Sequence, residues 1–148
     1  MHQFEIVPGQ GVGPIRFGMT RSEVRNHLGP PEDNEDAERE WYLEDLAIDF
    51  DPSGKVKFIE IAQSENLRGL IGGMSLLDVD ADDAITHVST MAPWDDNDPE
   101  LGYSYVFPKL QLSLWRPMIP EDDQDADDPT GRRFESVGVG ADGYFDAE

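Results

Sequence analysis

The chain repeats one order of local patterns. Residues 41–61, WYLEDLAIDFDPSGKVKFIEI, give aromatic residues, a short turn, an alternating apolar stretch, a second turn and a second apolar stretch. Residues 105–139 keep that order, with a long acidic loop in place of the second turn. A glycine-containing entry and a helix-like stretch precede both, at residues 13–29 and 70–91. The repetition predicts two tandem helix-plus-β-hairpin units.

The first helix has clear local signals. Thr20 and Glu23 have the spacing of a capping box, in which each side chain bonds the backbone amide of the other residue. Val24 and Leu28 then fall on one helical face, and Gly29 followed by two prolines predicts the end of the helix. In the second unit, a helix is expected from about Ala81 to Met91, with a core-facing side formed by Ala84, Ile85 and Val88.

Alternation predicts the strands. Leu46, Ile48 and Phe50 alternate with Ala47 and Asp49, as in a half-buried strand, and residues 56–61 form the returning strand. Leu110, Leu112 and Leu114 give the same pattern in the second unit. If Glu44 and Asp45 form a two-residue turn, Trp41 joins the buried face and Tyr42 points outward.

These patterns predict an α+β fold, with helices on one face of an antiparallel sheet. We expect a single domain, residues 1–148, built from two repeats of about 1–62 and 63–148, with an acidic loop at 116–131. A lone hairpin is marginally stable, so the two units are expected to share one sheet.

The net charge of −21 limits the partners. A field of this sign repels nucleic-acid phosphates and anionic membranes, and it attracts basic proteins and cations. Residues 63–148 hold 19 of the 32 acidic residues and five of the 11 basic ones. We therefore expect a basic protein partner, no nucleic acid and no membrane. Adaptation to high salt is an alternative explanation, and the oligomeric state stays open.

Other sequence features exclude several classes of function. The chain contains no cysteine, which rules out disulfides and thiolate chemistry. The N-terminus lacks the pattern of a signal peptide, so the expected location is cytoplasmic. The three histidines are dispersed, and no nucleophile elbow, His-x-x-x-His motif or phosphate loop is present. We expect no enzyme, no catalytic residue and no cofactor.

One segment has the residue spacing of a calcium-binding loop. Residues 49–60, DFDPSGKVKFIE, have acidic or hydroxyl oxygens at positions 1, 3 and 5, glycine at 6 and glutamate at 12, which is EF-hand spacing. The flanking residues alternate as strands do, and Lys57 occupies a ligand position. A β-hairpin turn around Gly54 is therefore favoured and no metal site is assigned. A small cation- or ligand-binding module, with calcium at an acidic loop, remains the alternative function.

The stretch from Gly18-Met19-Thr20 through the first helix to Gly29-Pro30-Pro31, followed by a hairpin, resembles a recurrent small fold. This fold occurs in the small protein A family of outer-membrane assembly lipoproteins and, in tandem, in the β-lactamase inhibitor protein family. In the second unit only Gly73-Met74-Ser75 keeps the motif. The resemblance implies a binding scaffold whose open sheet face holds another protein. Immunity proteins that neutralise toxins are similar in size and acidity.

Exposed aromatic residues beside acids are the expected binding site. Aromatic side chains supply most of the affinity in protein interfaces, and rim carboxylates orient a basic partner. Trp94 and Trp115 have an alternative role, in which they close the end of the core. The predicted site consists of Tyr42, Trp94, Asp95, Asp96 and Trp115.

Overall fold

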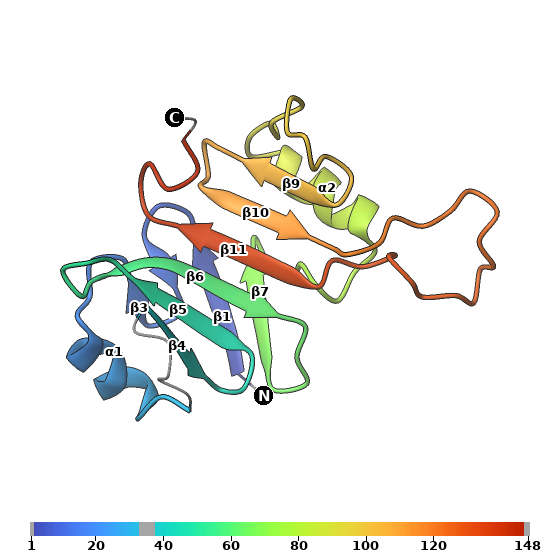
Figure 1. Cartoon of the computed structure of the whole chain (residues 1–148). Coiled ribbons are helices and arrows are strands. Elements are labelled where there is room, and N and C mark those ends of the chain that lie inside the picture. Colours follow the sequence, from blue (N-terminus) through green and yellow to red (C-terminus); the bar gives the residue numbers. More distant parts are fainter. Residues whose placement is uncertain (1, 33–37, 147–148) are drawn as a thin grey trace.

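The computed structural model describes residues 2–32 and 38–146, and in these residues the fold is mainly β. Two sheets, one of six strands and one of five, pack face to face (Figure 1). The strands are β1 His2–Val7, β2 Gly11–Val12, β3 Ile15–Arg16, β4 Arg39–Tyr42, β5 Leu46–Phe50, β6 Val56–Ala62, β7 Leu67–Ile71, β8 Met74–Ser75, β9 Ser104–Phe107, β10 Leu112–Trp115 and β11 Ser136–Gly140; the helices are α1 Arg21–Leu28 and α2 Ala81–Ser89.

The six-stranded sheet contains three strands from each half of the chain. Its order is β4-β5-β6-β11-β10-β9, and every neighbouring pair is antiparallel. The halves meet where β6 pairs with β11, with Ile61 opposite Val137. Both side chains are fully buried, so the junction between the halves is part of the main core.

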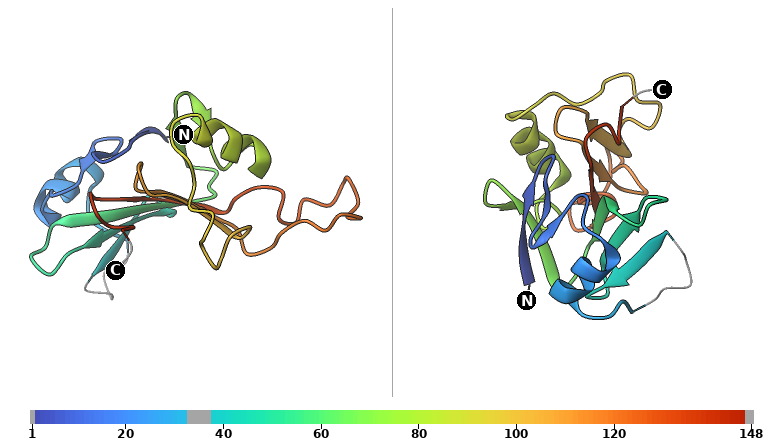
Figure 2. Two further views of the ribbon diagram at one scale, coloured as in Figure 1. Left: turned by 90° about the horizontal axis from the view of Figure 1, so that it is seen from above. Right: turned by 90° about the vertical axis from the view of Figure 1, so that its left-hand side faces the viewer.

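The second sheet, β3-β2-β1-β7-β8, lies behind the first (Figures 1 and 2). Its centre is a parallel pair of β1 and β7, with Phe4 opposite Gly69. A methyl group added to Gly69 would lie 2.8 Å from Cδ1 of Ile61 on the six-stranded sheet. The absence of a side chain at Gly69 therefore allows the two sheets to approach closely.

The predicted fold class is wrong. We expected an α+β fold with helices on one face of a single antiparallel sheet; the structure has two sheets, and its helices are only eight and nine residues long. The prediction assigned no strand to Gly11–Val12 or to Leu67–Ile71. Both become strands by pairing with β1, and the partner of β7 is more than 60 residues away in sequence. Local alternation does not reveal such pairing.

The local helix signals are confirmed. Thr20 and Glu23 form the complete capping box, and Gly29, with φ of 82°, ends α1 by donating its N–H to the carbonyl of Arg25. In α2 the buried residues include Ala84, Ile85 and Val88, as expected. In Figure 1, α1 lies beside β3 and β4, whereas α2 lies behind β9 and β10.

The β4–β5 turn is longer than predicted, and this reverses the orientation of two aromatic residues. Tyr42 pairs with Leu46, which leaves Leu43, Glu44 and Asp45 in the turn. Leu43 and Glu44 both have positive φ, 52° and 69°, a conformation that non-glycine residues seldom adopt. With one more turn residue than assumed, Tyr42 is buried and Trp41 lies on the outer face with Arg39.

Candidate functional site

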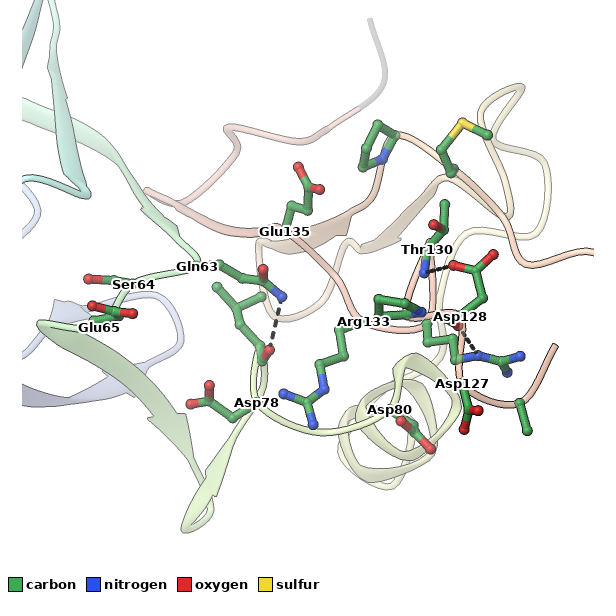
Figure 3. A pocket seen from close by; sticks show the side chains of 17 residues that line it. Gln63, Ser64, Glu65, Asp78, Asp80, Asp127, Asp128, Thr130, Arg133 and Glu135 are labelled. Atoms are coloured by element: carbon green, nitrogen blue, oxygen red, sulfur yellow. Dashed lines mark hydrogen bonds between the residues drawn. The ribbon is translucent and has the colours of Figure 1, made fainter. Parts of the chain in front are cut away.

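A cleft of about 940 Å³ opens where β6 ends and β11 begins (Figure 3). Four segments form its walls: residues 63–65 after β6, residues 77–80 before α2, residues 117–118 after β10, and residues 126–135 before β11. Two arginines, Arg132 and Arg133, also line it. We call this feature the acidic cleft, because six carboxylates line it: Glu65, Asp78, Asp80, Asp127, Asp128 and Glu135.

Gln63 connects the walls of the acidic cleft through hydrogen bonds. Its side-chain amide donates hydrogen bonds to the carbonyls of Leu77, at 3.3 Å, and Phe134, at 3.0 Å. Its backbone N–H donates to the carbonyl of Glu135. One residue therefore holds three segments that are distant in sequence, and this fixes the width of the cleft.

The acidic loop, residues 116–131, projects from one end of the molecule and has its own hydrogen-bond framework (Figure 1). Arg132 donates to the backbone carbonyls of Asp128, at 2.7 Å, and Asp125, at 3.0 Å. The side-chain amide of Gln124 donates to the carbonyls of Asp128 and Thr130. These donors bond backbone oxygens, which leaves most carboxylates of the loop facing solvent.

The carboxylate of Asp128 has a local role. It accepts a 3.0 Å hydrogen bond from the backbone N–H of Thr130, and this bond is the main cause of its lowered pKa. Asp128 is therefore ionised at neutral pH while it stabilises the turn that leads back to β11.

A buried arginine anchors both ends of the acidic loop. Arg116 follows β10; its Nε donates to the carbonyl of Gly102 and its Nη1 to that of Gly131, both at 2.9 Å. Its guanidinium also lies 5.2 Å from the ring centroid of Phe134. These contacts link the acidic loop, the segment before β9 and the core.

The predicted site residues do not form one site. Trp115 is 44% exposed on the outer face of β10, and its predicted outward orientation is confirmed. Tyr42 is 1% exposed, so the prediction that it points outward is wrong and its side chain offers no contact area to a partner. The cause is the three-residue turn between β4 and β5.

Trp94 and its acidic neighbours lie in the segment between α2 and β9. The Trp94 ring packs edge-on against Tyr105 and Phe107, at 5.8 and 6.5 Å, yet 37% of the residue is exposed. Asp95 accepts a hydrogen bond from the backbone N–H of Asn97, and Asp96 is exposed. Trp94 thus covers the edge of the core and leaves part of its surface exposed; its role in binding a partner stays a prediction.

A polar cluster around the buried carboxylate of Glu40 links α1 to β4. Glu40 is 3% exposed; it accepts hydrogen bonds of 2.7 Å from both Arg25 and Tyr42, and Arg21 lies 3.5 Å away. Burial raises the pKa of Glu40, but the bonds from Arg25 and Tyr42 outweigh it, and the net pKa is lowered. Burial, followed by the bond to Glu40, raises the pKa of Tyr42. The cluster therefore contains an ionised carboxylate and a neutral phenol, together with the guanidinium groups of Arg25 and Arg21.

The segment with calcium-loop spacing is a β-hairpin turn, as favoured by its sequence. Gly54 has φ of 81°, and the flanking segments are β5 and β6. The Asp51 carboxylate accepts hydrogen bonds from the backbone N–H groups of Lys55 and Ser53 and from the Ser53 hydroxyl; the Lys55 bond is the main cause of its lowered pKa. Across residues 2–32 and 38–146, no group of three or more metal-binding side chains is arranged to hold an ion.

The acidic cleft was not predicted, although the acidity of its loop was evident. Its walls come from residues 63–65, 77–80, 117–118 and 126–135, and their proximity depends on the pairing of β11 with β6 and with β10. The side-chain bonds of Gln63 carry no sequence signal. Only the excess of acidic residues after position 62 pointed to this half of the chain.

Within the described part of the chain, neither helix has the length and apolar character required to cross a bilayer. Comparisons of the chain with models of known families, with curated proteins and with solved structures find no match. The resemblance drawn from Gly18-Met19-Thr20 and Gly29-Pro30-Pro31 gains no support from these comparisons.

Proposed function

We propose that this chain is a non-enzymatic, cytoplasmic binding protein that sequesters a basic protein partner. Its more specific form would be an immunity-type inhibitor that neutralises a basic toxin. The partner's positive charge is the central element of the proposal, because the chain has 32 acidic and 11 basic residues.

The acidic cleft carries this proposal. Six carboxylates line a concavity with only two arginines, and one of these, Arg132, is bonded to backbone carbonyls of the acidic loop. Concave surfaces lined by one sign of charge focus the electrostatic field and raise the association rate of partners of opposite charge. The acidic loop beside the cleft adds to this field.

The alternative function, a calcium or small-cation module, is less favoured at the first hairpin. The oxygens that the spacing would offer have partners in the protein: Asp51 bonds its own turn, while Asp49 and Glu60 both bond Arg39. Calcium would have to displace these bonds, because it needs six to eight oxygen ligands.

Affinity capture across a salt series tests the proposed function. The immobilised chain is exposed to a lysate at low ionic strength, and the retained proteins are identified by mass spectrometry and eluted with increasing salt. We expect one basic protein to be retained in stoichiometric amount and released as salt rises, because exposed charges are screened beyond about 8 Å at physiological ionic strength. Retention of no basic protein at low salt would refute the proposal.

A pair of charge-matched variants locates the interaction. Glu65→Gln/Glu135→Gln removes two exposed carboxylates from the acidic cleft, and Glu5→Gln/Asp142→Asn removes two exposed carboxylates elsewhere. We expect the cleft variant to slow association with the captured partner several-fold more than its control. Equal effects of both variants would show that net charge alone attracts the partner.

A further inference from the structure

Exposed apolar side chains gather beside the β9 edge of the six-stranded sheet. Trp94 and Leu101 are each 37% exposed, Ile119 is 39% exposed and Tyr103 is 42% exposed. They come from the segment between α2 and β9 and from the start of the acidic loop. We call Trp94, Leu101, Tyr103 and Ile119 the edge patch.

Contacts on both sides hold the edge patch in place. Cδ1 of Ile119 lies 2.7 Å from the position that a Cβ would take at Gly102, so Ile119 packs directly on the backbone between Leu101 and Tyr103. The carbonyl of Tyr103 accepts a 2.8 Å hydrogen bond from the backbone N–H of Arg116.

The other end of the edge patch is held by aromatic packing. Trp94 packs edge-on against Tyr105, which in turn packs edge-on against the buried ring of Phe134. The exposed rings and aliphatic groups thus stand on an ordered base. A fixed base reduces the entropy that a binding surface loses when a partner docks.

Acidic residues flank the members of the edge patch in the sequence. Asp95, Asp96, Asp98 and Glu100 lie between Trp94 and Leu101 in sequence, and residues 121–123, Glu-Asp-Asp, follow Ile119 after one proline. The nearby basic residue Arg116 is 6% exposed and donates to backbone carbonyls. The apolar surface therefore has a negative rim.

We infer that the edge patch docks a segment of the partner in which apolar side chains are flanked by lysine or arginine. The inference rests on the proposed function and specifies the chemistry of its partner: charge alone is insufficient, and apolar residues must enter between the acids. A second copy of this chain does not fit, because its net charge of −21 would place like charges across the contact.

Two synthetic peptides test this inference on the full-length chain. One contains lysine and leucine; the other has the same length and charge but serine in place of leucine. By isothermal calorimetry at physiological ionic strength, we expect the lysine–leucine peptide to bind about tenfold more tightly or better, because desolvated apolar anchors supply most of the affinity of an interface.

Matched variants test whether the lysine–leucine peptide binds at the edge patch. Tyr103→Ser and Ile119→Ser are each expected to weaken binding of the lysine–leucine peptide by about tenfold and to leave the lysine–serine peptide unaffected. Tyr144→Ser is the control, since Tyr144 is also 42% exposed but packs on Phe58 and Phe145. Circular dichroism melting of each variant separates loss of binding from loss of fold.

Three results would overturn the inference. Equal binding of the two peptides would show that the edge patch has no role in binding. Charge attraction would still be supported, and so would the proposed function. Weakening by Trp115→Ser but not by Tyr103→Ser would move the docking surface to the outer face of β10. Binding of neither peptide would overturn the edge patch and the attraction of basic chains together.

Discussion

The hydroxyl of Tyr42 donates a 2.7 Å hydrogen bond to Glu40, two residues earlier on β4, and both side chains are buried on the inner face of that strand. The other oxygen of Glu40 accepts a 2.7 Å bond from Arg25 in α1. One buried carboxylate therefore holds the first helix against the edge of the six-stranded sheet.

Loss of this carboxylate should destabilise the fold strongly. Glu40→Ala leaves the Tyr42 hydroxyl buried without its acceptor, and an unsatisfied buried polar group costs about 2 kcal/mol. Tyr42→Phe removes one hydrogen bond to a charged group and should cost about 1.5 kcal/mol. Urea denaturation measures both. Glu5→Gln, an exposed change on β1, is the control and should alter the free energy of unfolding by less than about 0.5 kcal/mol.

The stabilisation by Glu40 should disappear in acid. Its pKa is lowered in the folded protein, because the bonds from Arg25 and Tyr42 outweigh the opposing effect of burial. A lowered folded pKa means that the full stabilisation is present above the pKa of a free glutamate, about 4.3, and is lost as pH falls through the folded value.

Comparison of the wild type with Glu40→Gln tests this sign, since glutamine keeps an acceptor oxygen for Tyr42 but has no charge. The difference in their free energies of unfolding should be constant near neutral pH and shrink below about pH 4.3. A difference that stayed constant down to about pH 3 would show that the charge of Glu40 does not contribute.

Truncation of two adjacent residues of β10 should change the free energy of unfolding by very different amounts. Leu114 is fully buried, and Leu114→Ala should cost about 3 kcal/mol through lost burial and the cavity that remains. Trp115 faces outward, so Trp115→Ala should change the free energy of unfolding by less than about 1 kcal/mol. Thermal melting followed by circular dichroism compares them. A sharp loss of stability in Trp115→Ala would mean that this ring contributes to the core.

Arg116 should control the order of the acidic loop. Arg116→Met keeps the length of the side chain but loses the bonds to the carbonyls of Gly102 and Gly131. We expect faster hydrogen exchange in residues 117–131 and in the segment before β9, with little change in β5 and β6, because the hydrogen bonds of Arg116 go to Gly102, Tyr103 and Gly131. Lys109→Met is the control, because it also replaces a positively charged side chain with methionine but lies in the turn between β9 and β10. Uniformly faster exchange would indicate global destabilisation instead.

Several features with short-range causes were predictable from the sequence. Thr20 and Glu23 form the capping box because the interaction spans only three residues. The turn at Asp51–Gly54 needs only a glycine with positive φ and an aspartate that accepts from its own turn. The alternation of Leu46, Ile48 and Phe50 fixes which of their side chains share a face.

The candidate site was less predictable. Trp115 was placed correctly, because alternation with Leu112 and Leu114 determines its side of the strand. Tyr42 was misplaced, because the length of the β4–β5 turn depends on Leu43 and Glu44 adopting positive φ, which their side chains disfavour. One additional turn residue reversed the inward and outward positions of β4.

The sequence by itself determined the ends of the first helix, the turn at Asp51–Gly54, the faces of β5 and β10 and the strongly negative charge, since each depends on neighbouring residues or on composition. Only the tertiary structure decided that β1 and β7 pair in parallel to form a second sheet, and that residues 63–65, 77–80, 117–118 and 126–135 enclose the acidic cleft. These features depend on contacts between distant segments. Their free energy comes from burying apolar faces against one another, and a hydrophobic face does not specify which other face will cover it.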